Sequence, residues 1–194
     1  MLSRRMFLAG LSAGSAANGL CLLDLNPARA EAVLGDDGLY RQPWFLESFL
    51  ELADDLAGAN EKKKRFAIMW ELRSCPYCKQ THLVNFAKPE IENFIKDRFE
   101  VLQLNIIGSR EVTDFDGEKL SEKRMAEKYG VRYTPTFQFF SDNVTGLARK
   151  KPREREVARA QGYLEPRDFL AMFRFVTERA YEKGSLRDYL KANS

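Results

Sequence analysis

Two short apolar runs, separated by a stretch with helical spacing, define the middle of the chain. Residues 66–72 (FAIMWEL) and 99–106 (FEVLQLNI) predict buried strands, because each is a compact run of apolar and β-branched or aromatic residues. Between them we expect one helix over residues 75–87 and a second that starts at Pro89, since proline is tolerated only in a first turn. Strands joined through a helix form a βαβ unit, so these two are predicted to be parallel.

The flanking segments predict further helices and strands. A one-sided apolar pattern predicts a helix that begins at Pro43 and ends near Gly58. The second half predicts a Ser121-capped helix over 122–129, a strand over 137–140, a hairpin turn at 142–143 and an antiparallel strand over 144–149. The charged run 150–159 is expected to be a solvated loop or an edge, and residues 161–164 either end a last strand or lead into a long helix from Pro166, which a short terminal helix over 186–191 follows. The order is helix, strand, helix, strand, helix, strand, strand, helix.

The first thirty residues predict an export signal. Ser3-Arg4-Arg5-Met6-Phe7-Leu8 matches a twin-arginine signal, a mildly apolar Gly/Ser/Ala-rich region follows, and Pro27-Ala28-Arg29-Ala30 matches a small-x-small cleavage site. We therefore expect residues 1–30 to be removed and residues 31–194 to reach the periplasm as one domain with a short C-terminal helical extension. The alternative is an uncleaved N-terminal anchor.

Composition narrows the function classes. With 44% hydrophobic and 30% charged residues and a net charge of +3, the 194-residue chain has the profile of a globular protein and no marked attraction to nucleic acid. No segment after residue 30 has the run of about twenty apolar residues that a membrane span needs. Only three cysteines occur, and Cys21 leaves with the leader, so a disulfide framework is excluded.

The remaining pair, Cys75 and Cys78, lies where the first strand turns into a helix. Unpaired N–H groups and the helix dipole at that joint favour a thiolate, which makes Cys75 the candidate nucleophile and Cys78 the resolving thiol. Two other interpretations stay open: an inert structural pair, or a soft-metal site formed with His82 on the same helical face. His82 is otherwise expected at the helix surface. Lys79 occupies the position that haem attachment requires, so no cofactor is expected.

Cys75-Pro76-Tyr77-Cys78 after a strand, together with Tyr133-Thr134-Pro135-Thr136 before a later strand, resembles the thioredoxin-like superfamily over residues 39–181. The resemblance implies an α/β thioredoxin fold, with a central mixed β-sheet flanked by helices. With the leader and residues 162–173 (GYLEPRDFLAMF), the chain is similar to the SoxW-type periplasmic thioredoxins of bacterial sulfur oxidation.

The resemblance also implies site roles. Cys75 and Cys78 would form the redox-active disulfide, Pro135 would be a cis-proline facing it, and Thr134 would offer its backbone to a substrate that also contacts Pro76 and Tyr77. The buried acid of thioredoxins falls here on Met69. Glu71, two residues further on the same strand face, is a candidate proton acceptor, and a surface-facing glutamate is the alternative.

As a SoxW-type protein, the chain would reduce disulfide-bearing periplasmic proteins with electrons from a membrane thiol transporter. Two alternatives remain at this stage. The first is a copper or soft-metal carrier that uses Cys75, Cys78 and His82. The second is a disulfide-forming oxidase or isomerase, because the spacing of the cysteines does not set the direction of electron flow.

Overall fold

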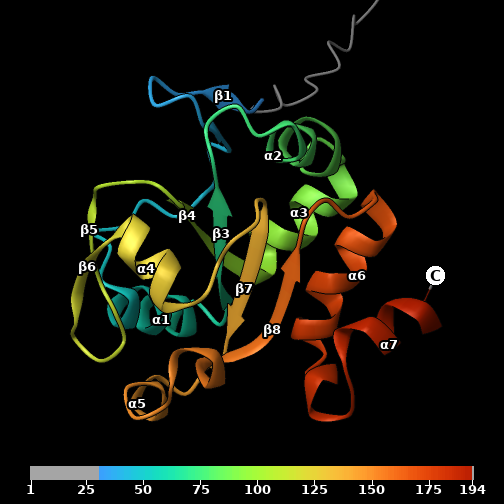
Figure 1. Ribbon diagram of the computed structural model, residues 1–194. Helices are drawn as coiled ribbons and strands as arrows, with labels where there is room; N and C mark the ends of the chain where they lie inside the picture. The colour runs from blue at the N-terminus through green and yellow to red at the C-terminus, as the bar shows by residue number, and fades with distance from the viewer. Residues whose placement is uncertain (1–30, 194) are drawn as a thin grey trace, which may run out of the picture.

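A four-stranded sheet forms the centre of the fold (Figure 1). The computed structural model describes residues 31–193, so the predicted leader lies outside the described residues. The strand order is β4-β3-β7-β8. Strands β3 (Arg65–Glu71) and β4 (Phe99–Asn105) are parallel, as predicted. Strand β7 (Thr136–Phe140) pairs antiparallel with β3, and β8 (Glu156–Gln161) pairs antiparallel with β7.

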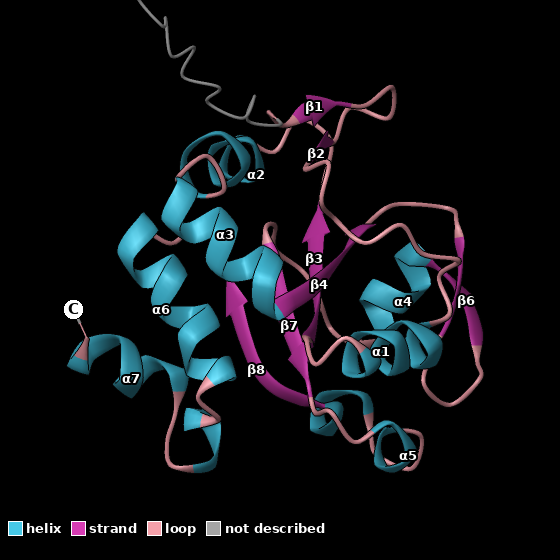
Figure 2. Cartoon of the chain, turned by 180° about the vertical axis from the view of Figure 1, so that it is seen from behind, coloured by secondary structure: helices cyan, strands magenta, loops and turns pink. Residues whose placement is uncertain are grey.

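Helices cover both faces of this sheet (Figure 2). Side chains alternate along β3: Phe66, Ile68 and Trp70 pack in one core with residues of α1 (Leu52–Glu61) and α4 (Glu122–Lys128). Ala67 and Met69 pack in the other core with residues of α3 (Pro89–Arg98) and α6 (Pro166–Thr177). The predicted fold class, a mixed sheet flanked by helices, is confirmed.

The helix predicted from Pro43 is wrong over its first half, because α1 begins only at Leu52. Leu50 has a left-handed backbone with φ 65°, which interrupts helical hydrogen bonding. Its carbonyl instead accepts a hydrogen bond from Thr113 N–H at 2.8 Å, and the neighbouring Phe49 side chain is 99% exposed. The apolar spacing of residues 45–50 therefore does not reflect a helix.

The predicted hairpin partner of β7 is also wrong. Residues Val144–Leu147 form the short helix α5, because the Asn143 side-chain oxygen accepts a hydrogen bond from Gly146 N–H at 3.2 Å and caps it. The strand next to β7 is instead β8, which comes from the charged run expected to be a loop or an edge. Its arginine charge is compensated locally: Arg159 donates to Glu156 and to the Tyr129 carbonyl, which makes an edge strand compatible with a polar sequence.

The other elements lie around this core. They are β1 (Val33–Leu34), β2 (Tyr40–Arg41), α2 (Pro76–Gln80), the π-helix η1 (Thr81–Asn85), β5 (Glu111–Thr113), β6 (Lys119–Ser121), the 3-10 helices η2 (Pro152–Arg155) and η3 (Ala180–Glu182), and α7 (Leu186–Ala192). The short hairpin β1–β2 lies beside the end of β3 from which the chain enters α2 (Figure 1). Within residues 31–193, the helices are all too short or too polar to cross a bilayer.

Candidate active site

The chain turns sharply between β3 and α2, and this turn presents the two cysteines. Ser74 has a left-handed backbone with φ 61°, and the Cys75 N–H then donates to the Leu72 carbonyl at 3.2 Å. Cys75 is the N-cap residue of α2, and Pro76 occupies the first helical position, where no intrahelical N–H is required. The observed joint between strand and helix is the one the sequence predicts.

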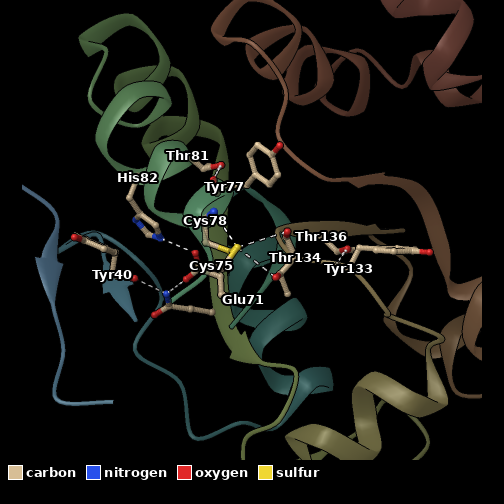
Figure 3. Close-up of a disulfide and its surroundings, with 11 residues drawn as sticks. Tyr40, Glu71, Cys75, Tyr77, Cys78, Thr81, His82, Tyr133, Thr134 and Thr136 are labelled. Atoms are coloured by element: carbon tan, nitrogen blue, oxygen red, sulfur yellow. Dashed lines mark hydrogen bonds and ion pairs between the residues drawn. A yellow bond between two sulfur atoms is a disulfide. The ribbon is translucent and has the colours of Figure 1, made fainter. Parts of the chain in front are cut away.

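Cys75 and Cys78 form a disulfide, with their Cα atoms 5.2 Å apart (Figure 3). The two sulfurs differ in access: Cys75 is half-buried, whereas Cys78 is 5% exposed. The Cys78 N–H also donates to Cys75 Sγ at 3.1 Å. A backbone donor aimed at Cys75 stabilises negative charge there, so the accessible sulfur is also the one better suited to be a thiolate.

The loop before β7 approaches Cys75 from the other side. The Thr134–Pro135 peptide bond is cis, and Pro135 is buried. Thr134 Oγ1 donates to Cys75 Sγ at 3.3 Å, and the Thr134 carbonyl oxygen lies 3.6 Å from the same sulfur. The Pro135 carbonyl accepts a hydrogen bond from Gly162 N–H at 2.8 Å, which fixes the loop to the chain after β8. The structure thus brings together Cys75, Cys78, Thr134 and Pro135.

Three tyrosines that are at least partly exposed lie next to the site residues in the chain or stack on such a neighbour. Tyr77, between the cysteines, is 55% exposed and stacks on Tyr163 with ring centroids 6.3 Å apart. Tyr133, next to Thr134, is 64% exposed. Burial and the nearby Glu165 carboxylate raise the pKa of Tyr163, so its hydroxyl stays neutral and donates to Asn85 at 3.1 Å. Tyr163 could not be assigned from sequence, because it lies far along the chain from the cysteines.

Glu71 and His82 form a buried pair behind the disulfide. The prediction that His82 lies at the helix surface is wrong: its exposed fraction is 1%, as is that of Glu71. His82 Nε2 lies 2.9 Å from Glu71 Oε1 (Figure 3). Gln103 donates to the other carboxylate oxygen, and Gln42 contacts His82. The sequence did contain a sign of this burial: Cys78 and His82 are four residues apart, so they lie on the same face of a helix.

The soft-metal interpretation is not supported by this arrangement. Both ring nitrogens of His82 already have protein partners, Glu71 and Gln42. Within residues 31–193, no group of three histidine, cysteine or carboxylate side chains is arranged to hold a metal ion.

Comparison with known families agrees with this geometry. A family model described as "Thioredoxin-like domain" matches residues 52–177, most of the described chain. The chain belongs to this thioredoxin-like family. As a thioredoxin-like protein with a disulfide between a half-buried and a buried cysteine, it is a thiol–disulfide oxidoreductase.

Among solved structures, one with a TM-score above 0.5 has the same fold at low identity. A thioredoxin-fold protein from Helicobacter pylori is 22% identical with a TM-score of 0.51, covering 68% of this chain and 84% of its own. A thioredoxin from Thermus thermophilus is 22% identical with a TM-score of 0.48, covering 66% of this chain and 84% of its own. The comparison with curated proteins finds no match.

Proposed function

We propose that this protein is an exported thioredoxin-like reductant that reduces disulfides in periplasmic proteins of a bacterial sulfur-oxidation system. The observation that carries the catalytic part is the unequal access of the two sulfurs: Cys75 is half-buried beside Thr134, and Cys78 is almost fully buried. The leader and residues 162–173 resemble those of SoxW-type proteins, and this resemblance supports a role in periplasmic sulfur oxidation.

The reaction follows from these positions. The Cys75 thiolate attacks one sulfur of a substrate disulfide, forms a mixed disulfide and releases the other substrate sulfur as a thiolate that takes up a proton. Cys78 then loses its proton and attacks Cys75 Sγ, which forms the Cys75–Cys78 disulfide and releases the second substrate thiol. Two electrons pass from the protein dithiol to the substrate, so a membrane thiol transporter, or another dithiol donor, must reduce the protein again.

The aromatic surface suggests the kind of substrate. Tyr77 and Tyr133 supply large exposed rings beside Cys78 and Thr134 in the chain, and the partly exposed Tyr163 stacks on Tyr77. Such a surface favours a polypeptide with apolar side chains beside its disulfide, because ring contacts bury apolar area. The extended backbone of that polypeptide would lie along Thr134.

Trapping tests the assignment of the two thiols. In the Cys78→Ser variant the mixed disulfide cannot be resolved, so the variant should retain periplasmic partners through Cys75, and mass spectrometry would identify them. Cys75→Ser is the matched control and should retain few or none. Equal trapping by both variants would contradict the assignment of Cys75 as nucleophile.

The reduction potential tests the direction of electron flow. A reductant should have a potential of about −270 mV, and a value of about −120 mV would instead identify a disulfide-forming oxidase.

The export proposal has its own test: cell fractionation should find a chain that starts at Glu31 in the periplasm, and replacing Arg4 and Arg5 by lysine should keep it in the cytoplasm.

A further inference from the structure

The Glu71–His82 pair is a closed hydrogen-bonded unit inside the protein. Glu71 ends β3 and His82 is the second residue of the π-helix η1, so the pair joins the sheet to the segment that follows the cysteines. The Glu71 carboxylate has a donor for each oxygen: His82 Nε2 at Oε1, and the Gln103 amide at Oε2. A buried carboxylate is tolerated only with such partners.

The protonation of His82 can be derived from Gln42. The Gln42 amide nitrogen donates to the His82 carbonyl oxygen at 3.3 Å, which orients the amide, and the same nitrogen lies 3.2 Å from His82 Nδ1. Because a donor faces Nδ1, that nitrogen accepts, and the ring proton is on Nε2, where it points at Glu71. The ring is held on its other sides by Tyr40, Phe45 and Phe86, with centroid separations of 6.1, 5.7 and 5.4 Å.

The pair is connected to the disulfide through a pocket of about 460 Å³ at the β1–β2 hairpin. The residues that line this pocket include Glu71, Cys75 and Cys78. Among the described residues, Glu71 is the only carboxylate in this lining. The titratable side chains that share the space are Tyr40, Arg73 and Lys79. Arg73 and Lys79 are exposed, and neither is a proton acceptor while charged. Strand β4 contributes only the uncharged Gln103 to the pair.

We propose that His82 is a positioning residue for thiol–disulfide exchange: it holds the Glu71 carboxylate so that this group takes the proton from Cys78 during resolution. The inference rests on the proposed function. Before the transfer, the pair carries one negative charge. After it, Glu71 is neutral, Cys78 is a thiolate, and attack on Cys75 Sγ releases the substrate thiolate, which takes a proton from water. The proton on Glu71 leaves through the pocket before the next cycle, and in the reverse reaction Glu71 returns it to Cys78.

His82 stabilises the charged form of Glu71 without competing for the Cys78 proton, because Nε2 is already protonated. Without this donor, the carboxylate would lose one of its two hydrogen-bond partners and its orientation. A glutamine at position 82 can still donate a hydrogen bond but has a different length and no ring. His82→Gln should therefore fold and misplace the acceptor.

A two-step thiol assay separates the two chemical steps. In the full chain carrying Cys21→Ser, Cys75 and Cys78 are the only thiols. An aromatic disulfide reagent releases one coloured thiolate when Cys75 attacks and a second when Cys78 resolves. His82→Gln should slow the second release about tenfold or more and leave the first within about twofold, since a positioned acid–base group contributes at least that much. The matched control is Thr81→Val: Thr81 is a buried neighbour on the same π-helix, its hydroxyl donates to the Tyr77 carbonyl, and its substitution should change neither step.

The pH dependence distinguishes positioning from a loss of packing. When the Glu71–His82 pair no longer accepts the Cys78 proton, hydroxide must accept it. The rate of the second step should therefore rise more steeply with pH in His82→Gln than in the wild type. Glu71→Gln should behave in the same way. The double variant should be no slower than Glu71→Gln, because both substitutions disable the same proton acceptor. Additive effects, or an unchanged pH profile in His82→Gln, would overturn the proposal.

The wild-type protein offers a readout that needs no variant. His82 is the only histidine in the sequence, so its imidazole NMR signals need no assignment. Their chemical shifts and pH dependence should differ between the oxidised and the reduced protein, because the Cys78 proton is present in only one of them. Identical signals in both states would overturn the inference. Failure of the wild type to reduce any protein disulfide would overturn the proposed function instead, and the two results are therefore distinguishable.

Discussion

Thr134 Oγ1 donates a hydrogen bond to Cys75 Sγ across 3.3 Å, from a loop that is 59 residues away in sequence. The same sulfur accepts the Cys78 N–H at 3.1 Å. Two donors from different elements therefore converge on the half-buried sulfur. We expect the same donors to stabilise a thiolate on Cys75, the proposed nucleophile, in the reduced protein. One of them comes from the loop that is proposed to bind substrate.

Thr134→Val should lower the reactivity of Cys75. Valine has nearly the same shape but no hydroxyl, so the thiolate loses one of its two donors. A hydrogen bond of this kind is worth about 1 kcal/mol, which predicts a decrease of roughly fivefold in the rate of Cys75 alkylation at neutral pH. Thr134→Ser keeps the hydroxyl and should restore most of the rate. An unchanged rate in the valine variant would show that the backbone N–H of Cys78 is sufficient.

Tyr77→Ala should affect protein substrates more than small ones. The ring is 55% exposed and stacks on Tyr163, so its removal deletes a contact surface and leaves the disulfide in place. We expect kcat/KM for a protein disulfide to fall about tenfold, as for a moderate contact residue, and the reaction with a small aromatic disulfide to stay within about twofold. Tyr77→Phe is the control and should retain activity. An equal loss of activity with both substrates would show that Tyr77 maintains the geometry of the turn and does not contact the protein substrate.

The sequence predicted the β3–α2 joint and the parallel β3–β4 pair because these depend on local patterns. A compact apolar run, a proline at a first helical turn and a Cys-x-x-Cys at their junction are short-range signals. The likeness to known proteins added the loop at Thr134 and Pro135, which no spacing could have placed opposite Cys75.

The errors arose where distant contacts outweigh local preference. Leu50 is left-handed because its carbonyl pairs with Thr113 from β5. The polar run that forms β8 is compatible with a strand because Arg159 donates to the Tyr129 carbonyl of another element. His82 was expected at the helix surface unless it bound a metal. Its partners Glu71 and Gln42 come from a strand and from the N-terminal segment, and their convergence cannot be read from one helix.

Asp55, in the first turn of α1, predicts a pH-dependent stability that is independent of the cysteines. Burial, together with the charges of Asp54 and Glu51, raises the pKa of Asp55 to about 6, although Ser48 donates a hydrogen bond to it at 2.6 Å. Because this pKa is raised on folding, the stabilisation from Asp55 is complete below its ordinary pKa of 3.8 and is lost as the pH rises through about 6.

Asp55→Asn should therefore stabilise the protein at neutral pH. The amide still accepts the Ser48 hydrogen bond and carries no charge to desolvate. We expect the free energy of unfolding at pH 7 to rise by about 1 kcal/mol, less than the full pKa shift implies because the side chain is partly exposed. Urea titrations at several pH values would measure this, and the two proteins should converge in acid. A gain that persists undiminished well below pH 4 would contradict the stated cause.

Arg155 is expected to be the most sensitive charged residue for stability. Its guanidinium is 2% exposed and donates to Asp114 and Asp116, each at 2.7 Å, and to the Tyr129 hydroxyl at 3.0 Å. Burial alone would raise the pKa of Asp116, but the hydrogen bonds from Arg155 and Lys128 hold it far below its ordinary value. This arginine therefore neutralises the buried Asp114 and the more exposed Asp116, and these contacts fix η2 before β8.

Arg155→Leu should destabilise the fold without changing the chemistry of the cysteines. The buried Asp114 would keep only Lys128 as a cationic partner, and breaking a buried ion pair from one side costs about 3 kcal/mol. Urea unfolding would measure the loss, and alkylation of Cys75 in the folded fraction should proceed at the wild-type rate. Arg155→Lys keeps the charge but loses the paired N–H groups, so it should lose less stability than the leucine variant. If Arg155→Leu costs less than about 1 kcal/mol, Lys128 alone compensates the cluster and the role assigned to Arg155 is wrong.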